Sequence, residues 1–170
     1  KDMLLKMGEI VGDLLADQVI HGGADGVQLF DTWAGLLSPE VYREFAMPAT
    51  ARTIEVFRAK IERDVPVIHY AKGSSHLHTA IRELDLNVIS LDWRDDLAEN
   101  RRRFGDKFAF QGNLDPSLLH GSTAMARAAT RDVLAAAGDK PGHIFNLGHG
   151  FAPSARIECV ETVLREIVGE

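Results

Sequence analysis

The chain has 170 residues, of which 45% are hydrophobic and 26% are charged, and its formal net charge at pH 7 is −6. This composition is typical of a globular protein, and we expect a single domain over residues 1–170 that is long enough to bury a core. The acidic balance argues against a general nucleic-acid or anionic-membrane surface. An anionic substrate would need a local basic patch.

The chain contains one cysteine, Cys159, which excludes an intramolecular disulfide and a cysteine-based metal cluster. A lone cysteine fits a reducing cytosol, so we expect a cytoplasmic protein. No apolar run reaches the ~18 residues of a membrane-spanning helix. The opening KDMLLKMGEIVGDLL carries acidic residues within its apolar pattern, unlike a signal peptide. Because this opening already has a helical pattern, we expect a fragment, or a chain whose first half lies elsewhere.

The first third of the chain predicts a helix, a strand and a second helix. Apolar residues at helical spacing predict a helix over 3–21, and HGGADG predicts a turn. The apolar run VQLFD (27–31) is typical of a buried strand. The Ser-Pro pair at 38–39 predicts a helix start, and Pro48 predicts a break or kink in the helix that follows.

The rest of the chain continues this alternation of strands and helices. We expect strands at 65–70, 87–93, 108–113 and 143–148, helices at 75–84, 95–104 and 123–137, one helical turn within 114–122, and a last helix opened by Ser154. Short strands that alternate with helices predict parallel strands joined by right-handed crossovers.

Two architectures have this pattern: an open doubly wound sheet, and part of an eight-stranded β/α barrel. The first strand is followed by TWAGLL and not by the G-x-G-x-x-G fingerprint of dinucleotide-binding sheets. Five βα units in this length fit a barrel of normal size if about three units are missing. We therefore expect an α/β fold of the (β/α)8 type, represented by about five βα units of its C-terminal part.

Every predicted strand becomes polar at its carboxyl end, where both architectures bind ligands. The polar residues are Asp31 and Thr32, then His69, Tyr70 and Lys72, then Asp92, Trp93 and Arg94, then Gln111, Asn113 and Asp115, and finally Asn146 and His149. Several also have a purely structural interpretation. Asp31 and Asp115 could be caps or turn formers, Lys72 could be solvated, and His69 could be a satisfied histidine inside the barrel.

His149 is the strongest candidate for a functional residue. It lies between Gly148 and Gly150, which allow unusual backbone angles and the close approach of a ligand. A histidine can donate a hydrogen bond to an anion or a carbonyl group, and it titrates near neutral pH.

Four motifs in order, FDTWAG (30–35), LDWR (91–94), QGNLDP (111–116) and NLGHG (146–150), resemble the uroporphyrinogen decarboxylase family. The resemblance runs from GADGVQLFDTWAG to the last helix and covers the C-terminal half of that family's chain. It implies a β/α barrel, a homodimer in the cytoplasm, and a carboxy-lyase that converts uroporphyrinogen to coproporphyrinogen in heme biosynthesis without any cofactor or metal.

The resemblance also implies substrate-binding roles for Thr32 and His149. The family usually has Ser where this chain has Thr32, so the hydroxyl is kept and a methyl group is added. Asp31, Lys72, Gln111 and Asn113 are further candidates to line the cleft. The family's catalytic aspartate and arginine motif belong to the first half, and none of Asp31, Asp92 and Asp115 matches that aspartate. We therefore expect this chain alone to be inactive, and to form a homodimer or to pair with the missing N-terminal half.

Two alternatives stay open at this stage. The first is a zinc-dependent corrinoid or coenzyme M methyltransferase, a class that resembles the decarboxylases and binds zinc through a His-x-Cys pair and a distant cysteine. Here position 71, two residues after His69, is alanine, and the sole cysteine lies in the last helix. The second alternative is an inactive half-barrel fragment, whose open strand edges and apolar inner faces would drive association.

Overall fold

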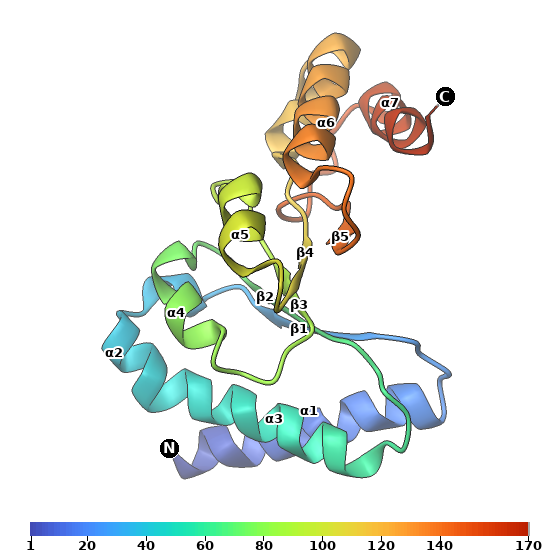
Figure 1. The fold of residues 1–170 in the computed structure, drawn as a ribbon. Helices are drawn as coiled ribbons and strands as arrows, with labels where there is room; N and C mark the ends of the chain where they lie inside the picture. The colour runs from blue at the N-terminus through green and yellow to red at the C-terminus, as the bar shows by residue number, and fades with distance from the viewer. Residues whose placement is uncertain (170) are drawn as a thin grey trace. The chain divides into compact units, whose positions relative to one another are not determined.

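The computed structural model describes residues 1–169, and it divides into two compact units, residues 1–88 and residues 89–170 (Figure 1). In chain order the elements are α1 (Asp2–Ile20), β1 (Val27–Asp31), η1 (Ala34–Leu36), α2 (Pro39–Val41), η2 (Tyr42–Ala46), α3 (Met47–Lys60), β2 (Val67–Ala71), η3 (Ser75–Leu77), α4 (His78–Ile81), β3 (Val88–Ser90), α5 (Leu97–Phe104), β4 (Ala109–Gln111), η4 (Pro116–His120), α6 (Thr123–Ala137), β5 (His143–Ile144) and α7 (Ile157–Val168). The sheet order is β1-β2-β3-β4-β5. We call the two parts unit 1 and unit 2.

In unit 1, β1 and β2 form a parallel ladder whose two faces differ. Leu29 is in register with His69, and Phe30 is in register with Tyr70. Because side chains alternate along a strand, each of these pairs lies on one face of the ladder. The rings of Phe30 and Tyr70 meet edge to face with centroids 6.1 Å apart. Leu29 and His69 line a cavity together with Phe30, Asp31 and residues of α1 and α3.

Helices α1 and α3 run side by side in unit 1 and approach closely through glycine (Figure 1). A Cβ atom on Gly8 would lie 2.6 Å from the Ala49 carbonyl oxygen, and one on Gly12 would lie 2.7 Å from that of Thr53. Those distances leave no room for a side chain, so the two glycines set the spacing of the helices.

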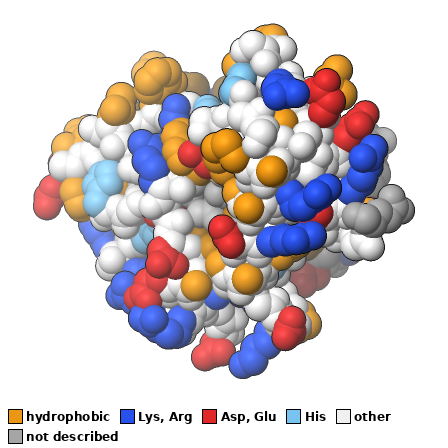
Figure 2. Space-filling model, turned by 90° about the horizontal axis from the view of Figure 1, so that it is seen from above, with side chains coloured by type: hydrophobic (Ala, Val, Ile, Leu, Met, Phe, Trp, Pro, Cys, Tyr) orange, Lys and Arg blue, Asp and Glu red, His pale blue; other side chains and the backbone are white. Residues whose placement is uncertain are grey.

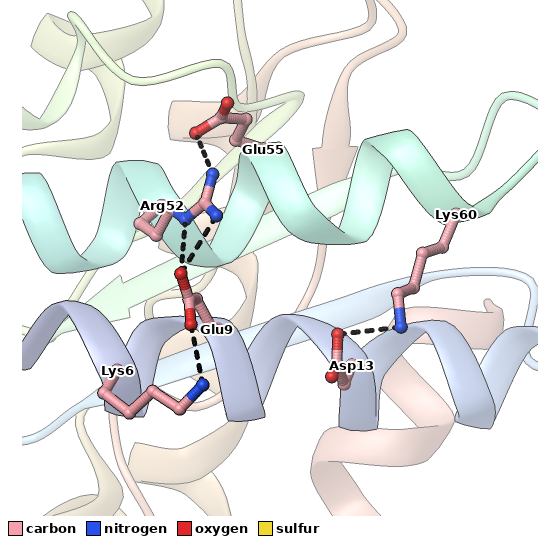
Figure 3. Close-up of polar contacts among 6 residues, drawn as sticks. All are labelled: Lys6, Glu9, Asp13, Arg52, Glu55 and Lys60. Carbon is pink, nitrogen blue, oxygen red and sulfur yellow. Dashed lines mark hydrogen bonds and ion pairs between the residues drawn. The ribbon is translucent and has the colours of Figure 1, made fainter.

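Ion pairs flank the contact between α1 and α3 (Figure 3). Arg52 bridges Glu9 at 3.0 Å and Glu55 at 2.9 Å, and Lys60 lies 3.0 Å from Asp13. Because the paired side chains are partly exposed, solvent screens each ion pair, and the buried glycine contact contributes more to the packing.

The predicted helix after Ser38 forms, and its irregularity lies just before Pro48. The Ser38 hydroxyl accepts a hydrogen bond from the Val41 N–H, which confirms the predicted cap. The helical span from α2 to α3 includes a π-helical segment, η2, and the Met47 N–H bonds to the Tyr42 carbonyl five residues back. Pro48 has no N–H to donate, and a π-helical turn accommodates the missing bond beside it.

Unit 2 contains its own parallel pair, in which Phe110 is in register with His143 and Gln111 with Ile144. The Leu91 N–H donates to the Gln111 carbonyl at 2.8 Å and so joins the end of β3 to β4. Helices α6 and α7 pack together (Figure 1). Their core includes Cys159, which is fully buried.

Some predicted boundaries are wrong. The last helix begins at Ile157 and not at Ser154: the Arg156 N–H donates to the Leu119 carbonyl at 2.9 Å, so docking on η4 sets the helix start. The predicted strand over 143–148 has only two ladder residues, followed by an isolated bridge between Leu114 and Leu147. The predicted helix over 75–84 shortens to one 3-10 turn and one α-helical turn. The expectation that residues 1–170 form a single domain stays a prediction.

The surface of the described residues mixes charges of both signs. Figure 2 shows one face, on which Lys and Arg side chains are interspersed with Asp and Glu side chains. In this view the net charge of −6 does not appear as a uniformly acidic face.

Candidate functional site

The loop after β1 carries FDTWAG, and its carboxylate has a structural role. The Asp31 carboxylate accepts a hydrogen bond from the Ala34 N–H at 2.9 Å, which confirms that it forms a turn. Thr32 follows with a half-buried side chain, and Trp33 is 73% exposed. Whether Asp31 also lines a cleft stays a prediction.

Gly35 closes this loop against the loop after β2. A Cβ atom at Gly35 would lie 2.1 Å from the Lys72 carbonyl oxygen and 2.7 Å from that of Gly73. Gly73 itself has a φ of 67°, a left-handed conformation that favours glycine. The glycine of FDTWAG is therefore required by backbone contact, and the half-buried Lys72 lies next to the same loop.

His69 faces the helices of unit 1 and not the barrel interior, which corrects the sequence-based expectation. It lines a cavity of about 300 Å³ together with residues of α1, α3 and β1. The side chain is 1% exposed, and neither ring nitrogen has a hydrogen-bond partner among residues 1–169. Burial lowers the pKa of His69 to about 4, and the neighbouring His78 adds to that effect. His69 is therefore neutral at pH 7, and its ring nitrogens lack the hydrogen bonds that the structural interpretation had assumed.

Tyr42 is a second buried polar side chain in unit 1. It is fully buried, and its hydroxyl has no hydrogen-bond partner among the described residues. Burial raises the pKa of Tyr42, and the negative charge of Asp31 raises it further. The phenol therefore stays protonated. The sequence contained no signal that this tyrosine would be buried.

In unit 2 the residues of LDWR form a compact ion pair. The Asp92 carboxylate accepts from the Arg94 backbone N–H at 2.8 Å and from the Arg94 Nε at 3.2 Å. The Asp92 side chain is 1% exposed, whereas that of Arg94 is 51% exposed. A buried carboxylate thus holds a guanidinium group whose outer half faces solvent.

Gln111 and Asn113 are buried and tie the strand ends of unit 2 together. The Gln111 amide donates to the Ser90 hydroxyl at 3.1 Å. The Asn113 amide donates to the Asp92 carbonyl at 2.9 Å and to the Asp95 carbonyl at 2.7 Å. These contacts support the segment that carries LDWR, and the expectation that both residues line a cleft stays a prediction.

Asp115 caps a helical turn, which was one of the two interpretations left open for it. Its carboxylate accepts from the Ser117 N–H at 2.8 Å and caps η4. The next strand is anchored through His143, whose Nε2 lies 2.6 Å from the Gly112 carbonyl oxygen. Burial lowers the pKa of His143, while that hydrogen bond opposes the shift.

The NLGHG loop packs directly on LDWR. A Cβ atom at Gly148 would lie 2.3 Å from the Trp93 backbone nitrogen. The next residue, His149, is half-buried, and its ring lies nearly parallel to that of Trp93, with centroids 6.3 Å apart and planes inclined by 26°. The sequence contained no local signal for this contact, because 56 positions separate the two residues.

The two residues with the strongest predicted binding roles lie in different units, Thr32 in unit 1 and His149 in unit 2. Their convergence on one ligand stays a prediction. Within residues 1–169, no three His, Cys, Asp or Glu side chains come together as they would around a metal ion. In the described part of the chain, no helix is both long and apolar enough to cross a membrane.

The fold places the chain among the β/α barrels. A solved structure of a methyltransferase from Methanosarcina mazei superimposes with a TM-score of 0.75 over 91% of this chain and 44% of that one. The two sequences are 18% identical, so this likeness concerns the fold alone. The predicted α/β fold of the barrel type, with parallel strands in chain order, is confirmed.

The family follows from the sequence comparisons. Residues 1–168 match the family model of uroporphyrinogen decarboxylase (URO-D). Relatives named uroporphyrinogen decarboxylase include one from Magnetococcus marinus, 40% identical over 99% of this chain and 48% of its own length. Another, from Streptomyces avermitilis, is 43% identical over 90% of this chain and 42% of its own length. The chain therefore belongs to the uroporphyrinogen decarboxylase family, and it spans about half the length of these relatives.

Proposed function

We propose that this chain contributes the C-terminal half of a uroporphyrinogen decarboxylase active site, which removes carboxyl groups from the four acetate side chains of uroporphyrinogen. The observation that carries the proposal is the match over residues 1–168. The packing of NLGHG on LDWR supports it, because it holds the candidate histidine in a fixed place.

The chemistry needs no external electron sink. Loss of CO₂ from an acetate on an electron-rich pyrrole leaves the equivalent of a carbanion, unless the ring is first protonated at carbon. The protonated pyrrole then accepts the electrons of the breaking bond, and the substrate serves the purpose of a cofactor. The protein has to orient the macrocycle and to hold its carboxylates with hydrogen-bond donors.

In this proposal the Thr32 hydroxyl and the His149 imidazole bind the substrate. Lys72 lies in the loop after β2 and adds positive charge in an otherwise acidic chain, whereas the charge of Arg94 is balanced by Asp92. The groups that bind the pyrrole nitrogens and start the reaction lie in the half that the relatives carry in addition. The isolated chain is therefore inactive and pairs with that half or forms a homodimer. The proposal also includes a cytoplasmic location, with no nucleic-acid partner.

A hybrid protein tests the function. The chain replaces the matching part of the Magnetococcus marinus relative, and the hybrid is incubated anaerobically with uroporphyrinogen. We expect coproporphyrinogen as the product, and no turnover by the isolated chain. His149→Ala is expected to reduce kcat/KM by about tenfold or more, as the loss of a hydrogen bond to a charged group does.

Cys159→Ala is the matched control in the same unit, since the thiol is buried in the core around α7. We expect it to change kcat/KM by less than about twofold. Equal losses for both variants would contradict the assignment of His149. A folded hybrid that forms no coproporphyrinogen would contradict the function.

The methyltransferase alternative has support from the fold only. Its zinc chemistry requires thiolate ligands, and Cys159 is buried and far along the chain from His69. Stoichiometric zinc in the purified chain would revive it.

A further inference from the structure

The indole of Trp93 contacts two side chains that bear on the candidate site. The imidazole of His149 stacks on it with an inclination of 26° and a centroid separation of 6.3 Å, within the range of an offset aromatic stack. The guanidinium carbon of Arg94 lies 4.7 Å from the indole centroid. We infer that Trp93 is a positioning residue that fixes the orientation of His149, an inference that rests on the proposed function.

Backbone contacts of the preceding residue, Gly148, hold the backbone at His149 in place. The Gly148 N–H donates to the Leu114 carbonyl at 2.7 Å, next to the bridge between Leu114 and Leu147. On its other side, the Gly148 Cα lies against the backbone of Trp93. The side chain of His149 therefore starts from a backbone position next to Trp93, the residue with which its ring stacks.

Trp93 is itself held from several directions. Its neighbour Arg94 is bound by the buried Asp92 carboxylate and lies over the indole ring, a cation–π contact. The Asp92 carbonyl in turn accepts from the Asn113 amide. The buried Asn113 thus holds Asp92, the carboxylate of Asp92 holds Arg94, and the guanidinium of Arg94 packs on the indole.

A parallel stack restricts how the imidazole can be used. It covers a ring face and leaves the ring nitrogens at the edge, so the N–H donors point within the plane of the ring. A ring held in this way loses less freedom when its donors bind a carboxylate. Removal of the stack is therefore expected to weaken substrate binding more than the reaction step.

The stack is tested first without substrate, by NMR of the chain. The His149 ring protons, identified by their absence in His149→Gln, are expected to shift by the ring current of Trp93. Trp93→Leu is expected to abolish that shift, and Trp93→Phe to keep part of it. Trp33→Leu, at the other tryptophan and in the other unit, is the matched control and is expected to leave these resonances unchanged. His149 resonances that are the same in wild type and Trp93→Leu would overturn the inference.

The positioning role is tested in the hybrid enzyme. Trp93→Leu is expected to raise KM about threefold to tenfold with kcat within about twofold, and Trp93→Phe to recover most of the loss. A Trp93→Leu variant with an unchanged KM, or a kcat loss that Trp93→Phe does not restore, would overturn the positioning role. A hybrid that is inactive without any substitution would contradict the proposed function, while the NMR comparison would still decide the stack.

Discussion

The loop after β1 in unit 1 and the loop after β5 in unit 2 pack in the same way but differ in how their side chains are positioned. Each loop contacts the backbone of a neighbouring loop at a glycine, Gly35 or Gly148, where there is no room for a side chain. In unit 1 the adjacent carboxylate caps its own turn, and Trp33 is 73% exposed. In unit 2 the indole of Trp93 stacks with His149, and the guanidinium of Arg94, which is paired with Asp92, lies over the same indole.

The difference shows that a motif can be rigid in its backbone without having its side chains positioned. The FDTWAG loop fixes the place of Thr32 through its turn, whereas the NLGHG loop fixes both the place of His149 and the inclination of its ring. In the proposed function, unit 2 therefore contributes a preorganised donor, which is the more effective arrangement for binding a charged group.

The largest expected effect is the loss of either glycine contact. Gly35→Ala and Gly148→Ala are each expected to lower the free energy of unfolding by about 3 kcal/mol, because the new methyl group would collide with backbone atoms. Gly150→Ala is the matched control, since nothing lies within 4 Å of its Cβ position, and it is expected to change stability by less than about 0.5 kcal/mol. Urea unfolding measures all three. Equal stability of the Gly148 and Gly150 variants would contradict the close approach.

A comparable effect comes from the buried histidine of unit 1. The pKa of His69 falls from 6.5 to about 4 on folding, so the folded state favours the neutral ring. The contribution of the neutral ring to the free energy of unfolding is complete above about pH 6.5. It is lost as the pH falls toward 4, a change of about 3 kcal/mol. His69→Leu is expected to reduce the acid sensitivity of unit 1 in hydrogen exchange.

His143→Gln in unit 2 is the comparison for that experiment. The pKa of His143 is also lowered by burial, but its ring is hydrogen-bonded and less buried, so a smaller reduction is expected. An acid sensitivity that His69→Leu leaves as it was would show that His69 is solvated.

The smallest effect distinguishes the two aspartates. Asp92→Asn is expected to cost about 2 kcal/mol, because a buried carboxylate loses a charge-assisted hydrogen bond. Asp31→Asn keeps an oxygen that can accept from the Ala34 N–H, so a cost within about 0.5 kcal/mol is expected. Thermal unfolding measures both. If Asp31→Asn were the more damaging change, the carboxylate of unit 1 would have a role beyond its turn.

The sequence predicted the regular elements better than the site. The helix over 123–137 was predicted to the residue, because Ser122 caps it and Gly138 ends it locally. The start of the last helix was wrong, because a long-range contact to Leu119 overrides the serine signal. Strand alternation could have revealed that His69 faces the helices, since Tyr70 beside it faces the opposite side. The stack of Trp93 on His149 has no local pattern and required coordinates.

The proposed function requires that Thr32 and His149, which belong to different units, bind one porphyrinogen. The most direct measurement is NMR of the hybrid protein with labelled Thr and His residues, titrated with uroporphyrin, the oxidised form of the substrate. We predict that the resonances of Thr32 and His149 shift together with one dissociation constant. Binding of the porphyrin with either resonance unchanged would contradict the account.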